Sequence, residues 1–371
     1  MRPLDTCPGP DLPAPAALTG VDRAIAELRR GGVVAVLGAE GGVVHALAAE
    51  AATPDRLAAL AARGGSLPAL AVTGRRARVL GLAAEDGGTI RLQAAGGLTA
   101  DVVAVLADPC LSGPRPGLDA IRADTAAAGC AVAQAVALAK LARLLPAVVV
   151  TEAAPAEADQ VRVTAADIAA YQVNAARSLR VVSQARVPLA AAENARIVAF
   201  RPADGGIEHL AIVIGAPDVD QPVLTRLHSE CFTGDLLGSL RCDCGDQLKG
   251  AIAEIAQAGS GVLLYLAQEG RGIGLVNKLR AYQLQDDGFD TLDANLQLGF
   301  DDDERIYQPA AQMLRLLGIG AVRLLTNNPV KVGQLAAHGI TVAERVPHVF
   351  PANDHNRSYL STKASRSGHL F

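Results

Sequence analysis

Aromatic residues are scarce in this sequence, and its first half has none. The 371 residues include no Trp, 6 Phe and 5 Tyr, and the first aromatic residue is Tyr171. A core without rings can still pack densely, but many small contacts between Ala, Val and Leu side chains must stabilise it. The change in composition near Tyr171 predicts two domains, 1–170 and 171–371, with an ordered connection at 171–187.

Strong basic charge, long apolar runs and a cysteine framework are also missing. The net charge is −4 and the sequence pI is about 6.0, which does not favour nucleic-acid binding. Residues 1–20 contain no apolar signal core, and no uninterrupted apolar stretch is long enough to cross a bilayer. Cys7, Cys110 and Cys130 are scattered along the chain. We therefore expect a cytoplasmic protein that binds neither nucleic acid nor a membrane.

The apolar periodicity predicts a mixed α/β (α+β) fold with two domains, each with a mixed sheet flanked by helices. We expect helices at 21–30, 43–63, 129–145, 248–258, 273–286, 307–317 and from 330 onwards. We expect strands at 33–37, 68–72, 89–93, 101–106, 147–151, 197–200, 209–214, 261–266 and 321–325.

Three cysteines in the run HSECFTGDLLGSLRCDCGDQL point to a metal site. Cys242 and Cys244 are one residue apart, and Cys231 precedes them by a short loop. Three thiolates leave one position of a tetrahedral zinc ion open to water, as in catalytic rather than structural zinc sites. His228 is near, but we expect it to point elsewhere. The cysteine trio (Cys231, Cys242 and Cys244) therefore predicts a zinc ion that activates water, with a structural zinc knuckle and a redox pair as alternatives.

Two predicted strands are followed by polar junctions that lead into helices. The first, QEGRGIG at 268–274, combines glycines that let a ligand approach the backbone with the guanidinium of Arg271. The second, TNNPVK at 326–331, places Lys331 at a helix start. Each is by itself an ordinary turn or helix cap. Because ligands collect beyond the carboxyl ends of strands in α/β sheets, together they predict a site for one ligand with several phosphates and a polar ring.

An acidic run, DDDER at 301–305, is the third polar feature of the second half. We expect Asp301 and Asp302 to be solvated. Asp303 and Arg305 are two residues apart, so on an extended segment they share one face and Glu304 points the other way. A carboxylate beside a guanidinium can orient water or a phosphate.

These motifs, in this order and spacing, resemble GTP cyclohydrolase II. The resemblance covers about residues 180–371 and rests on the cysteine run, on QEGRGIGLVNKLRAYQLQDDGFDTLDANLQLGFDDDER and on LLTNNPVKV. It implies hydrolysis of GTP to 2,5-diamino-6-(5-phosphoribosylamino)pyrimidin-4(3H)-one, formate and pyrophosphate, the first step of riboflavin biosynthesis. It also implies one Zn²⁺ per subunit, Mg²⁺ with the GTP phosphates, and a homodimer.

The resemblance further implies a role for each matching residue. The cysteine trio would bind zinc, Asp303 would accept a proton, and Tyr282 would help to open the imidazole ring. Arg305 would act at the α-phosphorus, as a nucleophile or, since a guanidinium stays protonated, by its charge alone. The residues that contact GTP would be Arg226, Leu227, His228, Ser229, Glu230, Gln247, Glu269, Arg271, Thr291, Thr326 and Lys331.

The first half more weakly resembles 3,4-dihydroxy-2-butanone 4-phosphate synthase, in AIAELRRGGVVAVLGAEGG, PALAVTGRRARVLGL and AGCAVAQAVALAKLARLLPAVVV. That enzyme binds Mg²⁺ through a dense acidic loop after its first strand. Here the loop at 37–42 has one carboxylate, Glu40, and Cys130 stands near the place of a missing metal histidine and its neighbouring acid. One carboxylate holds a catalytic Mg²⁺ poorly, so we predict an inactive domain that scaffolds or dimerises.

Two other functions stay open. One is a cyclohydrolase paralogue that stops at the formamide intermediate or serves another pyrimidine pathway. The other is a non-catalytic zinc- and nucleotide-binding regulator, although such a protein has no need of Tyr282, Asp303 and Arg305 beside the cysteine trio.

Overall fold

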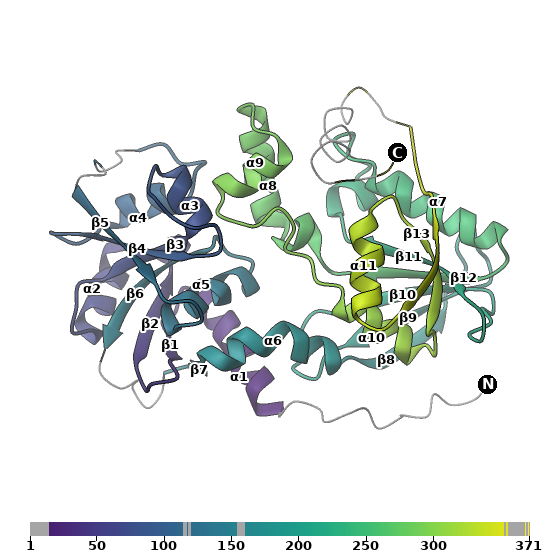
Figure 1. Ribbon diagram of the computed structural model, residues 1–371, viewed down its shortest axis with the longest axis horizontal. Coiled ribbons are helices and arrows are strands. Elements are labelled where there is room, and N and C mark those ends of the chain that lie inside the picture. The colour runs from purple at the N-terminus through teal and green to yellow at the C-terminus, as the bar shows by residue number, and fades with distance from the viewer. Residues whose placement is uncertain are drawn as a thin grey trace.

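The computed structural model describes residues 15–113, 117, 120–153, 160–351, 354, 368 and 370. Two seven-stranded mixed sheets form two lobes, with helices packed against both (Figure 1). The predicted fold class is therefore confirmed. Cys7 lies outside the described residues; the other five cysteines are free thiols.

The sheet of the first lobe has the strand order β5-β4-β3-β6-β2-β1-β7 and is antiparallel except for the β1–β7 pair. Its strands are β1 (Val34–Leu37), β2 (Val43–Ala48), β3 (Ala69–Thr73), β4 (Thr89–Ala94), β5 (Ile121–Ala126), β6 (Ala147–Ala153) and β7 (Arg162–Thr164). Its helices are α1 (Pro15–Arg29), α2 (Pro54–Arg63), α3 (Gly74–Val79), α4 (Ala100–Ala107), α5 (Ala131–Leu141) and α6 (Ala165–Arg177).

Alternate residues of β6 supply the two faces of this sheet. Val148 and Val150 point into a core of Ala, Val, Leu and Ile with helices α1, α5 and α6. Ala147 and Val149 point into a second core with α2, α3 and α4. This two-residue alternation is the pleat of a strand that is buried on both sides.

The sheet of the second lobe has the order β14-β13-β11-β12-β10-β9-β8. Its strands are β8 (Arg180–Arg186), β9 (Ala195–Arg201), β10 (His209–Ile214), β11 (Val223–Ser229), β12 (Gly261–Leu266), β13 (Ala321–Leu325) and β14 (Thr341–Val346). Its helices are α7 (Cys244–Gln257), α8 (Leu275–Asp286), α9 (Thr291–Gln297), α10 (Gln308–Leu316) and α11 (Pro329–Ala337). Strands β11, β12, β13 and β14 run parallel, so the carboxyl ends of β11, β12 and β13 meet at one edge.

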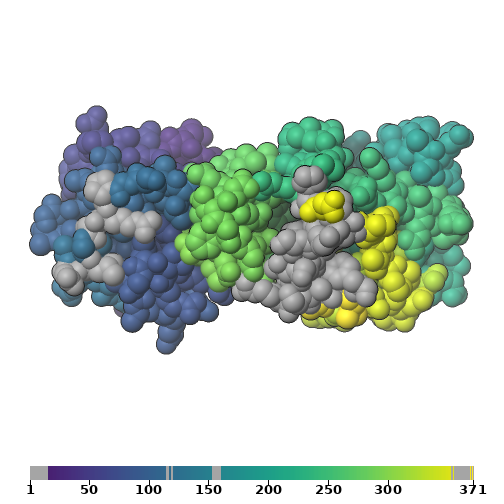
Figure 2. Space-filling model, turned by 90° about the horizontal axis from the view of Figure 1, so that it is seen from above, coloured from purple at the N-terminus to yellow at the C-terminus, as the bar shows by residue number. Residues whose placement is uncertain are grey.

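Helices α8 and α9 do not pack on the sheet that precedes them in sequence. Figure 1 shows them between the two lobes, and Figure 2 shows their green surface filling that space. Ala281, Leu284 and Ala294 share a core with Leu70 and other residues of the first lobe. The apolar face of the α8–α9 pair is thus buried against the first domain.

Two predicted elements were wrong. Residues 43–48 are strand β2 rather than the start of a helix, because this apolar run pairs with β1 on one side and β6 on the other. Residues 101–106 lie in helix α4 rather than a strand. The side chain of Thr99 accepts a hydrogen bond from the Val102 N–H and caps this helix, a local signal that outweighs the strand propensity of its valines.

Asp301 also departs from its prediction. It is half-exposed, but Arg75 of the first domain forms an ion pair with it at 2.6 Å, so it belongs to the contact between the lobes. Tyr171, at the predicted domain boundary, lies inside α6, and the second sheet begins at β8. The boundary itself stays a prediction.

Candidate functional site

A cavity opens at the edge where the carboxyl ends of β11, β12 and β13 meet. Counted to its open mouth, it holds about 1200 Å³. Every site residue predicted from the sequence lines it, except Leu227 and Asp303. Leu227 is buried in the core, and only its carbonyl is involved, as the acceptor of a 2.9 Å hydrogen bond from Lys331 Nζ. Asp303 lies behind Arg305.

The cysteine trio forms one wall of the cavity. Its three sulfur atoms lie within 4.8 Å of one another, and Cys231 Sγ is 3.8 Å from Cys242 Sγ. Tetrahedral zinc with Zn–S bonds of about 2.3 Å separates its sulfur ligands by about 3.8 Å. A Cβ atom on Gly234 would come within 2.8 Å of Cys242 Sγ and 3.0 Å of Cys231 Sγ, so only glycine leaves room for the cluster. The geometry fits a zinc ion.

The charges of the trio also favour a cation. Hydrogen bonds from Cys242 and Cys244 lower the pKa of Cys231 far below that of an ordinary thiol. The hydrogen bond to Cys231 raises the pKa of Cys242 to about 11, and that of Cys244 is raised as well. Negative charge on one sulfur therefore disfavours it on the other two, and a bound metal ion would offset this repulsion and hold all three as thiolates.

Asp235 organises the loop that carries Cys231. Its carboxylate accepts hydrogen bonds from the Cys231 N–H at 3.0 Å and from the Tyr265 hydroxyl at 2.9 Å. It also contacts His228 Nε2 at 3.0 Å. His228 is thus turned away from the sulfurs, as the sequence predicted, and it stacks on Tyr265 instead. Burial lowers the pKa of His228, which leaves the ring neutral at pH 7.

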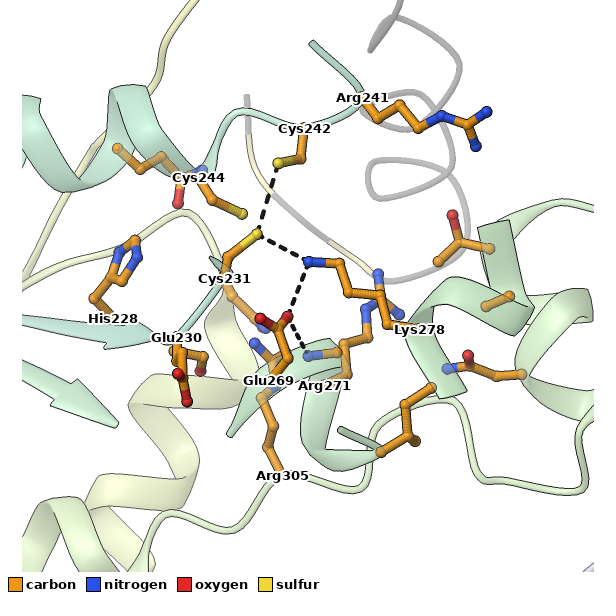
Figure 3. A pocket seen from close by; sticks show the side chains of 18 of the residues that line it. His228, Glu230, Cys231, Arg241, Cys242, Cys244, Glu269, Arg271, Lys278 and Arg305 are labelled. Atoms are coloured by element: carbon orange, nitrogen blue, oxygen red, sulfur yellow. Dashed lines mark hydrogen bonds and ion pairs between the residues drawn. The ribbon is translucent and has the colours of Figure 1, made fainter. Parts of the chain in front are cut away.

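The glycine loop, residues 267–274, forms the floor of the cavity. Arg271 adopts a left-handed backbone conformation with φ of 60°. Glu269 is buried, and its carboxylate accepts hydrogen bonds from the Phe232 N–H at 2.6 Å and from Lys278 Nζ at 2.9 Å. Figure 3 shows the side chains of Glu269, Lys278 and Cys231 converging. This loop is therefore tied to the cysteine loop before any ligand binds.

One face of α8 supplies Lys278 and Tyr282, which are one turn apart. Lys278 Nζ donates to Cys231 Sγ at 3.1 Å and to Thr233 Oγ1 at 3.0 Å. The Tyr282 hydroxyl lies 3.4 Å from Thr233 Oγ1, and the guanidinium carbon of Arg241 lies 5.0 Å from the ring centre. Burial raises the pKa of Tyr282 and keeps its hydroxyl protonated.

Residues of β11, α7 and the 326–331 junction also line the cavity. Arg226 donates to the Leu325 carbonyl at 2.9 Å and to Gln247 at 2.5 Å. Burial lowers its pKa to about 10, so it stays charged at pH 7. Three buried atoms of cavity-lining residues have no hydrogen-bond partner in the described structure, and these are Arg226 Nε, His228 Nδ1 and Ser229 Oγ. Buried polar atoms of this kind normally find partners, which here points to a polar ligand.

Asp303 and Arg305 interact as their spacing predicted. Arg305 Nε lies 2.8 Å from Asp303 Oδ1, and Nη2 lies 2.5 Å from Oδ2. Burial by itself raises the pKa of Asp303, but the hydrogen bonds and charge of Arg305 outweigh it and lower that pKa. Thr291 lies across the cavity at the start of α9 and accepts a hydrogen bond from Gln285 at 3.4 Å.

Lys278 is a cavity-lining residue that we did not predict. The KLRAY run places Lys278 four residues before Tyr282, and that spacing on a helix was the available signal. Other cavity-lining residues were missed because nothing in their local sequence distinguishes them from surface polar residues: Arg241, Gln285 and Asn295.

The fold and the site together define an α/β enzyme. Its candidate metal centre is the cysteine trio, which lies beside a cleft lined by arginine and lysine side chains. The sequence profile of GTP cyclohydrolase II matches residues 179–347. A GTP cyclohydrolase-2 of Azospirillum brasilense is 56% identical over 381 residues, covering 100% of this chain and 99% of that protein. The chain therefore belongs to the GTP cyclohydrolase II family and is a hydrolase.

Other relatives match the second half alone. A GTP cyclohydrolase-2 of Pseudomonas aeruginosa is 59% identical over 172 residues, 46% of this chain and 84% of that protein. The riboflavin biosynthesis protein RibBA of Bacillus cereus is 56% identical over 164 residues, 44% of this chain and 41% of that protein.

Among solved structures, RibBX of A. baumannii, a two-domain 3,4-dihydroxy-2-butanone 4-phosphate synthase, covers 89% of this chain and 99% of its own. Its sequence identity is 18% and its TM-score 0.34, a likeness too low to assign a function to the first half. Among the described residues, no helix is both long and apolar enough to cross a membrane.

Proposed function

We propose that this protein is a zinc-dependent GTP cyclohydrolase that releases formate and pyrophosphate and leaves 2,5-diamino-6-(5-phosphoribosylamino)pyrimidin-4(3H)-one, the first step of riboflavin biosynthesis. One observation carries the proposal. Three sulfur atoms within 4.8 Å of one another lie at one end of a cavity that is also lined by Arg271, Arg305 and Lys331. A metal-activated water and a cradle for phosphates are the two things this reaction needs.

The ring-opening end of the cavity is the end with the cysteine trio. The cysteine trio would hold the zinc ion, which would supply Lewis-acid activation of water for attack on C8 of the guanine ring. Tyr282, protonated and held beside Thr233, is placed to donate a proton to the leaving ring nitrogen. Lys278 offsets the negative charge of the thiolate of Cys231.

The phosphate end is the end with Arg271, Arg305 and Lys331. Their positive charges stabilise the charge that develops at the α-phosphorus when pyrophosphate leaves. Mg²⁺ enters with the GTP phosphates, its usual mode of binding. Asp303 holds the guanidinium of Arg305 through two hydrogen bonds, and its lowered pKa makes it a weak base. We therefore assign Arg305 an electrostatic role and Asp303 the task of orienting it until substrate binding separates the pair.

Recognition of the nucleotide falls to the remaining cavity residues. The unpartnered buried atoms of Arg226, His228 and Ser229 offer hydrogen bonds to a polar ligand. Gln247 and Thr326 lie beside them, and Thr291 lies across the cavity. Pairing these atoms stabilises the complex, and a ligand that left them unpaired would be rejected.

The test is incubation of the metal-loaded protein with GTP and Mg²⁺, followed by mass analysis of all products. We expect formate, pyrophosphate and the diaminopyrimidine in equal amounts. A product that retains its formyl group identifies the paralogue that stops at the formamide. GTP bound but unchanged identifies the regulator and contradicts the proposal.

We propose that the first domain has no synthase activity of its own. Glu40 lies in the exposed turn between β1 and β2, and Cys130 caps α5. In the described part of the chain, the cysteine trio is the one group of three or more metal-ligating side chains within ligand distance of each other. The full-length protein should therefore form no 3,4-dihydroxy-2-butanone 4-phosphate, and its formation would contradict this assignment.

We also propose a cytoplasmic homodimer. Reducing conditions there keep the trio as thiols ready for metal. Large apolar side chains are exposed on the loop after Cys231 and on α8, with Leu236 70% and Val276 59% accessible. Exposed apolar side chains that form a contiguous patch commonly mark an interface, and we propose that these do. Sedimentation analysis should give twice the chain mass, and a monomer at micromolar concentration would contradict the proposal.

A further inference from the structure

The first domain touches three segments that line or support the site. Lys140 forms a 2.6 Å ion pair with Glu304, next to Arg305. Arg280, on the back of α8, pairs with Glu50 and Asp108 at 2.9 Å each. The third segment is the glycine loop, and the first domain reaches it through Arg143.

Arg143 follows the last turn of α5 and has an unusual backbone. Among the described residues, Arg143 and Arg271 alone have positive φ without being glycine, with values of 58° and 60°. The turn at Arg143 is closed by hydrogen bonds from its own N–H to the Lys140 carbonyl at 2.9 Å and from the Leu144 N–H to the Ala139 carbonyl at 3.0 Å. These two hydrogen bonds form a Schellman helix end, in which the left-handed residue is usually glycine, so an arginine at this position is unusual.

The side chain of Arg143 braces both ends of the glycine loop. Its Nη2 donates to the Ala267 carbonyl, at the start of the loop, at 2.9 Å. Its Cβ and Cδ lie 3.1 Å from the position of a Cβ on Gly274, at the end of the loop, so glycine is needed there for this packing. Glu269 and Arg271 lie between these two contacts.

The backbone of Arg143 is tied to α8 through Asn277, which is fully buried. Asn277 Nδ2 donates to the Arg143 carbonyl and to the Ile273 carbonyl, both at 3.0 Å. Its Oδ1 accepts from Arg280 Nη1 at 2.8 Å. The back of α8 is thus fixed to the first domain, while its front carries Lys278 and Tyr282.

We propose that Arg143 is a positioning residue of the active site, through which the first domain holds the glycine loop in its nucleotide-binding conformation. The inference rests on the proposed function for its substrate, GTP. It gives the first domain a task that needs no chemistry of its own. Arg143 does not line the cavity, so it acts through the loop and not by touching the substrate.

Because the backbone of Arg143 is left-handed, a glycine substitution tests the side chain without straining the backbone. Arg143→Gly removes the side chain, and glycine adopts this conformation without strain, so the thermal midpoint should change little. Arg143→Met keeps packing on Gly274 but removes the donor to Ala267. Arg143→Lys keeps a stem and a donor. Arg29→Met is the matched control, because Arg29 is a nearby arginine whose Nε donates a hydrogen bond to the Ala142 carbonyl of its own domain.

Formate release and hydrogen–deuterium exchange should be measured on the full-length variants. We expect KM for GTP to rise about tenfold in Arg143→Gly and several-fold in Arg143→Met, because a loosened loop holds Glu269 and Arg271 less well against the nucleotide. We expect kcat to fall as well, because Arg271 also stabilises the charge that develops at the α-phosphorus. Amides of residues 269–274 should exchange faster, with unchanged zinc content. Arg143→Lys should recover most of the affinity, and Arg29→Met should match the wild type.

Two results would overturn the proposal. One is unchanged KM and loop exchange in folded Arg143→Gly and Arg143→Met. The other is a loss of stability in all three Arg143 variants, lysine included, with normal kinetics of the folded fraction, which would indicate a purely structural role. A wild-type protein that releases no formate would refute the proposed function instead, and loop exchange would then decide the role of Arg143 by itself.

Discussion

The two domains have sheets of equal size and very different chemistry. Each sheet has seven strands, but the first is almost entirely antiparallel, whereas the second has parallel strands β11, β12, β13 and β14. Parallel strands end at a common edge, and three loops of the second sheet bring cysteines, carboxylates and cations together there. In the first sheet the hairpin turn between β1 and β2 holds one charged residue, Glu40, among alanine and glycines. The candidate site lies where the topology concentrates polar loops.

The first domain also contributes to the structure of the site in the second domain. Helix α8 has its functional face in the second domain's cavity and its apolar face in the first domain's core. The first domain, whose described residues include no metal-ligating cluster, thereby supports the second domain, which carries the cysteine trio.

The largest effect is expected from a substitution in the cysteine trio, which only the second domain has. Cys242→Ser removes one thiolate from the trio, so zinc content should fall and formate release should drop by roughly a thousandfold or more. Metal analysis and formate assays measure both. Cys130→Ser changes a thiol of the first domain outside the trio and should leave both at wild-type levels. Retained turnover in the Cys242 variant would end the zinc assignment.

The next effect separates the two ends of the cavity. Arg305→Ala removes a positive charge from the phosphate end and should slow pyrophosphate release by about 100-fold to 1000-fold, the range seen when one stabilising group is lost. Zinc content should not change. Arg323→Ala removes an exposed arginine paired with Glu344 and serves as the control. Equal pyrophosphate rates in the two variants would remove Arg305 from the mechanism.

A third effect tests the seam between the domains. Arg280→Met leaves Glu50 and Asp108 without their shared cation in a mostly buried contact, so the free energy of unfolding should fall by about 3 kcal/mol. Arg241→Met breaks an exposed ion pair with Asp286 and should cost at most about 1 kcal/mol. Urea denaturation measures both values. Equal losses would mean that the domains are only loosely joined through α8.

The smallest effect is a pH dependence at the same seam. Burial, followed by the charge of Arg143, lowers the pKa of His209 from 6.5 to about 4. The unfolded chain therefore binds a proton between pH 6.5 and pH 4 that the folded protein does not, and stability falls as the pH is lowered through this window. His209 should account for about 2 kcal/mol of this loss. His209→Asn should flatten the stability curve there, and an unchanged slope would contradict the assignment.

Much of the site could be predicted because its signals are local. The spacing of Cys242 and Cys244, the glycines around Arg271 and the alternation of Asp303 and Arg305 each restrict geometry within a few residues. The errors were also local. Strand β2 and helix α4 are short apolar runs, for which burial on both sides masks the period that separates helix from strand.

The sequence by itself determined the family, the cysteine trio and the polar ends of the strands, because short-range spacing encodes them. Only the tertiary structure decided that Lys278 points at Cys231, that α8 belongs to both cores, and that Arg143 meets the glycine loop. Arg143 Nη2 and the Ala267 carbonyl are 124 residues apart in sequence. No periodicity or motif extends over such a distance, and the contact exists because two separately formed sheets bury one shared helix.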